Sequence, residues 1–117
     1  MLVSDNPELQ TKIKELQNSF IEFALEEESS VKNWHIKQCI NSIQRCLKRM
    51  DKCKTPKQAL RNIARTVVTL NVINKVAKYD LIYTTEREEI AEILNEAATI
   101  KGLNPLQEDL TEDFRTW

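Results

Sequence analysis

The chain has 117 residues, of which 41% are hydrophobic and 30% are charged, and its net charge is −1. This length and composition are typical of one globular domain that buries a single core without metal or disulfide staples. One glycine and three prolines leave little material for turns, which predicts few and long elements. No apolar run is long enough to cross a bilayer. An odd number of cysteines and the lack of a signal-peptide pattern favour a reducing, cytoplasmic location.

Capping residues divide the chain into helices. Each proline follows a residue that can cap a helix, at Asn6-Pro7, Thr55-Pro56 and Asn104-Pro105. Proline fits the first helical position because its missing N–H would be unpaired there. Capping-box patterns begin at Thr55 and Thr85, and Gly102 suits the left-handed residue that closes a helix. We predict helices near 7–28, 31–53, 56–78 and 86–101, and a tail over 103–117.

The first two helices carry narrow apolar stripes. In the first helix the stripe consists of Leu9, Ile13, Leu16, Phe20 and Phe23. In the second, two series of residues repeat every seven positions: Cys39, Cys46 and Cys53, and Ile36, Ile43 and Met50. Two heptad series offset by three residues form the seam that a helix lays against its neighbours. We therefore predict that the three thiols are free and point into the core as small hydrophobic side chains.

The last two helices differ from each other. Apolar residues cover more than half of the circumference of the helix 56–78, which predicts the most buried element, whereas the helix 86–101 has a strongly acidic outer face. The apolar link 79–84 should pack across one end of the molecule. Because the connections near 28–30 and 53–55 are short, consecutive helices must turn back on each other. The predicted fold is all-α: an antiparallel up-and-down four-helix bundle with a short C-terminal helical tail, in one domain spanning residues 1–117.

Charge is strongly segregated along the chain. Residues 1–30 carry two basic and seven acidic side chains, residues 31–65 carry ten and one, and residues 66–117 carry five and ten. One interpretation is a basic corner that binds an anionic macromolecule with an affinity that falls with salt. The other is mutual neutralisation, in which the acidic first and fourth helices flank the basic hairpin.

Residues with catalytic or metal-binding chemistry are sparse. His35 and Cys39 lie one turn apart and form at most half of a zinc site, and neither a second histidine nor a CxxC pair completes it. The only histidine has no nucleophile motif beside it, and the chain lacks the glycines of a phosphate-binding loop. We expect no enzyme activity, no cofactor, no metal, no small-molecule substrate and no membrane association.

The aromatic residues are candidates for contacts. Leu106, Leu110, Phe114 and Trp117 are spaced as one face of an acidic amphipathic helix, which either folds back onto the bundle or docks into a groove of another protein. Trp34 is predicted on the outer face of its helix. There the tail, the link 79–83 or a partner subunit can cover it.

These observations lead to a functional hypothesis. We expect a non-enzymatic protein-interaction module, such as a small regulator, inhibitor or assembly subunit, that binds a protein partner or a second copy of itself. The alternative is a nucleic-acid-binding protein that uses the basic hairpin of the second and third helices. The residues predicted to contact the partner are Trp34, Arg45, Lys48, Arg49, Lys52, Phe114 and Trp117.

Overall fold

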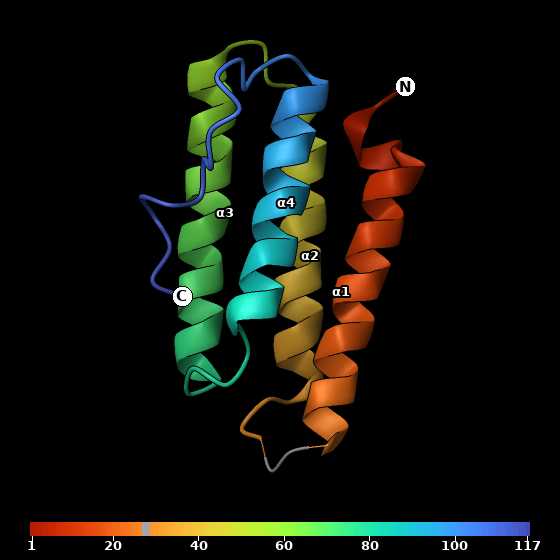
Figure 1. Cartoon of the computed structure of the whole chain (residues 1–117), viewed down its shortest axis with the longest axis vertical. Coiled ribbons are helices and arrows are strands. Elements are labelled where there is room, and N and C mark those ends of the chain that lie inside the picture. The colour runs from red at the N-terminus through yellow and green to blue at the C-terminus, as the bar shows by residue number, and fades with distance from the viewer. Residues whose placement is uncertain (27–28) are drawn as a thin grey trace.

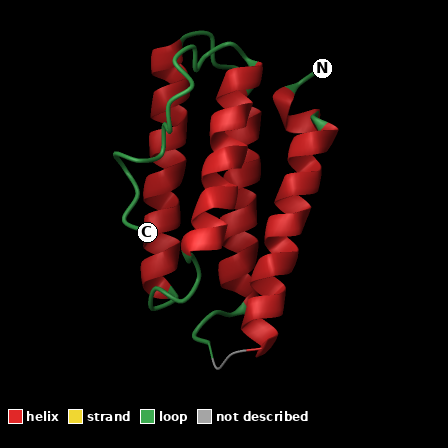
Figure 2. Ribbon diagram, viewed as in Figure 1, coloured by secondary structure: helices red, strands yellow, loops and turns green. Residues whose placement is uncertain are grey.

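The computed structural model describes residues 1–26 and 29–117, and the side chains of all of them except residues 25 and 26. Within these residues it contains four α-helices, one short 3-10 helix and no β-strand (Figure 2). The elements are η1 (Val3–Asp5), α1 (Pro7–Glu26), α2 (Asn33–Met50), α3 (Pro56–Val76) and α4 (Thr84–Ile100). The predicted all-α class is confirmed.

The four α-helices lie side by side along the long axis of the molecule, and consecutive helices run in opposite directions (Figure 1). In this view α4 lies in front of α2, with α1 on one side and α3 on the other. The molecule measures 43 × 28 × 19 Å. This arrangement is consistent with a four-helix bundle, and the C-terminal tail runs back along α3 (Figure 1).

The predicted helix ends are confirmed at three places. Asn6 Oδ1 accepts from the Leu9 amide (3.0 Å), and Thr55 Oγ1 accepts from the Gln58 amide (3.2 Å). Each bond satisfies one of the free amides at the start of a helix. Gly102 closes α4 with φ of +71°, a conformation that glycine adopts at little cost.

Two helix starts differ from the prediction. The second helix begins at Asn33, because the Lys32 amide donates to His35 Nδ1 (2.8 Å) and the histidine side chain acts as the cap. The fourth helix begins at Thr84, earlier than the predicted residue 86. Its capping box begins at Tyr83 and not at Thr85 as predicted, because Glu86 Oε1 accepts from the Tyr83 amide (3.3 Å). The predicted end of the first helix near residue 28 lies outside the described residues.

The predicted apolar stripes form the core, except for Phe23, which is half-buried and has its ring 5.2 Å from the ring of Tyr83. Both heptad series of α2 are buried, with Cys39 and Cys46 at 0% exposure and Cys53 at 8%. Burial disfavours the thiolate, and it raises the pKa of Cys39 to about 12 and that of Cys46 to about 11. The thiols are therefore core residues, as predicted. The link between α3 and α4 also packs inward through Leu81 and Ile82, as expected.

The prediction that the third helix is the most buried element is wrong along its outer side. Val68, Val72 and Val76 are 52%, 57% and 54% exposed, and Leu60 is 37% exposed. The inner side of α3 is fully buried at Ala59, Ile63, Val67 and Leu70. We call Val68, Val72 and Val76 the valine row.

The C-terminal tail folds back on the bundle, but it forms turns in place of the predicted helix. Asn71 Nδ2 donates to the Phe114 carbonyl (2.8 Å), and Asn71 Oδ1 accepts from the Thr116 amide (3.1 Å). Asn95 Oδ1 accepts from the Leu110 amide in the same way (2.9 Å). These side chains occupy backbone groups that a helix would pair internally. Tertiary contacts therefore override the amphipathic pattern of the tail.

Candidate interaction surface

The outer sides of α2 and α3 carry two rows of exposed cations. On α2 and the turn after it, Arg45, Lys48 and Lys52 follow at steps of three and four residues. On α3, Lys57, Arg61 and Arg65 follow at steps of four. Such spacings place side chains on one side of a helix. All six residues are exposed, and we call them the basic face.

No carboxylate neutralises the basic face within the described residues. None of its six cations has a described Asp or Glu oxygen within 4.0 Å; the ion pairs found there belong to Lys12 and Arg115. Asp51, the only acidic residue of the segment 31–65, accepts from the Val3 amide and the Ser4 hydroxyl, at 2.5 Å each. Its carboxylate therefore anchors the N-terminal turn. The charge of the basic face is uncompensated by these side chains.

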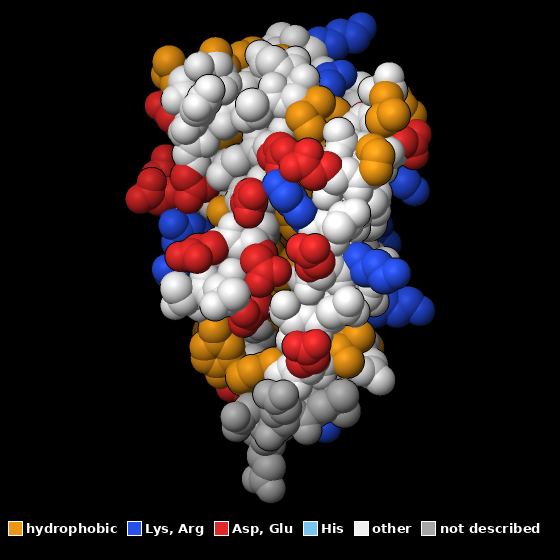
Figure 3. Space-filling view, turned by 45° about the vertical axis from the view of Figure 1, so that its right-hand side comes forward, with side chains coloured by type: hydrophobic (Ala, Val, Ile, Leu, Met, Phe, Trp, Pro, Cys, Tyr) orange, Lys and Arg blue, Asp and Glu red, His pale blue; other side chains and the backbone are white. Residues whose placement is uncertain are grey.

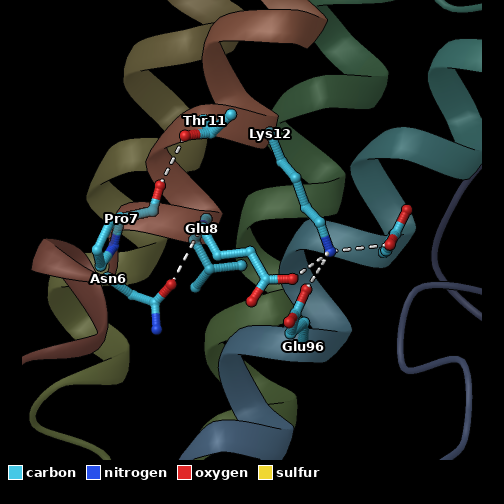
Figure 4. A network of polar contacts seen from close by, with 8 residues as sticks. Asn6, Pro7, Glu8, Thr11, Lys12 and Glu96 are labelled. Carbon is cyan, nitrogen blue, oxygen red and sulfur yellow. Dashed lines mark hydrogen bonds and ion pairs between the residues drawn. The ribbon is translucent and has the colours of Figure 1, made fainter.

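The α1/α4 side of the bundle has the opposite arrangement. Acidic side chains gather in the middle of this face, and basic side chains lie mainly at its edges (Figure 3). Lys12 reaches from α1 toward α4 and forms ion pairs with Glu96 (2.6 Å), Glu92 (2.9 Å) and Glu8 (3.6 Å), as Figure 4 shows for the labelled Lys12, Glu8 and Glu96. Hydrogen bonds to Glu96 and Glu92 raise the pKa of Lys12 well above its usual range. We call this group the Lys12 cluster.

Neutralisation is incomplete on the acidic face as well. Burial raises the pKa of Glu89, and the carboxylates of Glu86, Glu15 and Glu92 raise it further. Burial is the larger cause, and the second contribution comes from repulsion between Glu89 and these three neighbouring carboxylates. The predicted neutralisation of the basic hairpin by the acidic first and fourth helices is therefore not found among the described side chains. The acidic run 26–28 lies outside them.

Arg49, one of the predicted contact residues, has a different environment from its basic neighbours. It is half-buried, and its Nε donates to Asn62 Oδ1 (2.8 Å) while its Nη2 donates to Thr66 Oγ1 (3.1 Å). Asn62 Nδ2 in turn donates to the Cys46 carbonyl (2.9 Å). The guanidinium of Arg49 thus joins α2 to α3. The other predicted cations, Arg45, Lys48 and Lys52, belong to the free surface.

A groove continues the basic face along the boundary between α2 and α3. It has a volume of about 470 Å³ and is lined by Gln38, Asn41, Ser42 and Arg45 from α2 and by Val68, Thr69, Val72 and Ile73 from α3. Arg45 belongs to both the groove and the basic face. We call it the α2/α3 groove. Its valines were missed by the sequence reasoning, although the spacing 57, 61, 65, 68, 72 and 76 already places them on one row with the cations.

The three aromatic residues predicted as contacts lie in different environments. Trp34 is 49% exposed at the start of α2, and its ring lies 3.8 Å from the ring of His35. Phe114 and Trp117 are partly buried and pack against the core. The tail therefore holds its own aromatics against the bundle. Only Trp34 offers a large exposed aromatic surface among these three residues.

Few of the described side chains are candidates for catalysis or metal binding. His35 is 3% exposed, and its burial lowers the pKa of its side chain. The positive charge of Lys32 lowers this pKa further. His35 Nδ1 serves as a helix cap, while its buried Nε2 has no hydrogen-bond partner among the residues that the structure describes. Among the described residues, no three His, Cys, Asp or Glu side chains are grouped so that they could hold a metal ion. In that same part of the chain, none of the helices combines the length and apolar character that a membrane span requires.

Comparisons of this chain with known protein families, with curated proteins and with solved structures gave no match. The two distinctive surface features of the chain are the basic face and the α2/α3 groove that continues it.

Proposed function

We propose that this protein is a non-enzymatic interaction module that binds an acidic protein partner through its basic face. The observation that carries the proposal is the set of six exposed cations without a described carboxylate partner. Like charges held together raise the electrostatic energy of the isolated chain, and an anionic partner relieves it. Lys and Arg rows of this kind also speed the encounter with a partner of opposite charge.

An acidic protein fits the surface better than a nucleic acid does. The basic face is continuous with the exposed valine row of α3, which a protein can cover with apolar side chains and a phosphate backbone cannot. The chain as a whole carries a net charge of −1, and the acidic α1/α4 side would repel a second stretch of polyanion. Nucleic acid is the alternative partner, and the experiment must distinguish it from an acidic protein.

Charge reversal on the basic face is the direct test. In a triple variant, Arg45→Glu, Lys48→Glu and Lys52→Glu, we expect acidic proteins that co-purify with the wild type from the native cell to be lost. The matched control is Lys14→Glu, Lys32→Glu and Lys78→Glu, which makes the same charge change at exposed positions outside the basic face and the valine row. Circular dichroism and thermal unfolding of both variants establish that the fold is intact.

Three results would count against the proposal. One is equal loss of partners in both triple variants, which would indicate a nonspecific effect of net charge. Another is retention of all partners by the variant of the basic face. The third is binding of the wild type to a double-stranded oligonucleotide at physiological salt. In that case log affinity should fall as log salt concentration rises. A slope that is shallower in the triple variant of the basic face than in the wild type would favour the nucleic-acid alternative.

A further inference from the structure

We infer that the α2/α3 groove binds an amphipathic helix of the partner, with the acidic end of that helix over the basic face and its apolar side against the valine row. This inference rests on the proposed function and specifies its binding mode. The proposed site is the surface along α3 where exposed cations without a described carboxylate partner lie next to exposed apolar side chains.

The valine row has the dimensions of a helix contact. Val68, Val72 and Val76 are each more than half exposed and lie at successive turns of α3, so the row is about 12 Å long at 1.5 Å per residue. Val68 and Val72 also line the groove, whose opposite wall is formed by Gln38, Asn41 and Arg45 of α2. A helix laid between two antiparallel helices presents residues at i, i+4 and i+7 to such a groove.

The charge distribution gives the site a direction. Along α3 the cations Lys57, Arg61 and Arg65 precede the valines, so the row is basic at one end and mainly apolar at the other, where the exposed Lys75 borders it. From Lys57 to Val76 the row extends about 29 Å. This length matches a partner helix of roughly five turns. Acidic side chains at one end of that helix would lie over the basic face, while Leu, Ile or Phe side chains would cover the valines.

A second copy of this chain fits the groove poorly. Its acidic helices α1 and α4 have, among their described side chains, only Ile21 and Ile100 as exposed large apolar residues, and these two do not form a row. The acidic tail is not helical, and Asn71 already holds it against its own α3. We therefore assign the groove to a helix of another protein.

Selection from an unbiased library of displayed helical peptides tests the inference without a known ligand. We expect peptides enriched on the wild type to carry a row of Leu, Ile or Phe at helical spacing and acidic residues grouped at one end. Val72→Glu should weaken their binding by at least tenfold, because it places a carboxylate in the apolar part of the groove. The matched control, Ile100→Glu, changes another exposed apolar residue (47%, against 57% for Val72) that lies outside the groove, and it should leave affinity within twofold.

The outcomes separate the inference from the proposed function. If Arg61→Glu weakens the enriched peptides but Val72→Glu does not, the groove inference fails and the acidic-partner proposal stands. If neither substitution weakens them, both fail. Enrichment of neutral or basic peptides, or the absence of any enrichment, also overturns the groove inference. So does a dimer of the wild type that Val72→Glu dissociates in sedimentation, because the occupant would then be a second copy.

Discussion

The two sides of the bundle treat charge differently. On the α1/α4 side, Lys12 lies among three carboxylates, whereas on the α2/α3 side six cations have no described carboxylate within reach. The chain is close to neutral overall, so the difference arises from where the helices place their charges. A balanced composition therefore does not imply that the charges are paired. A side that pairs its own charges contributes to stability, and a side that leaves them unpaired is available to a partner.

The largest expected effect is on the Lys12 cluster. Lys12→Glu removes three ion pairs and places a fourth carboxylate among Glu8, Glu92 and Glu96. We expect the free energy of unfolding to fall by about 2 kcal/mol at low salt, and by less at high salt, where exposed charges are screened. Urea denaturation at both salt concentrations measures this change.

Two matched reversals complete that experiment. Lys14→Glu, at an exposed position of the same helix, and Arg61→Glu, on the basic face, should each change stability by less than about 0.5 kcal/mol, since neither breaks a described ion pair. A loss with Arg61→Glu as large as with Lys12→Glu would erase the distinction between the two sides.

A smaller effect on the free energy of unfolding should distinguish Arg49 from Arg45 on α2. Arg49→Ala removes two hydrogen bonds to α3 and leaves Asn62 Oδ1 without its donor, so we expect destabilisation of about 1–2 kcal/mol. Arg45→Ala, one turn earlier and exposed, should change stability by less than about 0.5 kcal/mol. Thermal or urea unfolding compares them. Equal stability of the two variants would place Arg49 on the free surface with the rest of the row.

The smallest expected effects are changes in the pKa values of Glu89 and His35. The pKa of Glu89 is raised by burial and by three carboxylates, and the pKa of His35 is lowered by burial and by Lys32. Added salt should screen the charge contribution and move both values toward the ordinary range, and Lys32→Gln should raise the pKa of His35. Nuclear magnetic resonance titration measures both.

The same titration has a consequence for stability. Because the pKa of His35 is lower in the folded chain than its ordinary value of 6.5, protons bind the unfolded chain preferentially. The contribution of His35 to stability is complete above pH 6.5 and is lost as the pH falls toward its folded pKa. His35 is the only histidine, so His35→Gln should flatten the dependence of stability on pH just below pH 6.5. An unchanged slope in this variant would assign the effect to other groups.

Much of the fold follows from local patterns in the sequence. The heptad series of α2 and the stripe of α1 up to Phe20 predicted which side chains are buried, because a helix that repeats apolar residues every 3.5 positions must cover that seam. Asn6, Thr55 and Gly102 predicted helix ends through hydrogen bonds within one or two turns. Of the candidate site, the exposed cations Arg45, Lys48 and Lys52 were also identified from sequence.

Only the tertiary structure decided the rest, because those features depend on contacts between distant segments. The tail has the pattern of an amphipathic helix, yet Asn71 and Asn95 bind its backbone and hold it in turns. Arg49 and Arg45 look equivalent in sequence, but Asn62 and Thr66 engage only Arg49. Periodicity shows which residues share a side of a helix, and only the packed bundle determines which side meets another helix. That is why the valine row of α3 was expected in the core and lies beside an unpaired row of cations at the surface.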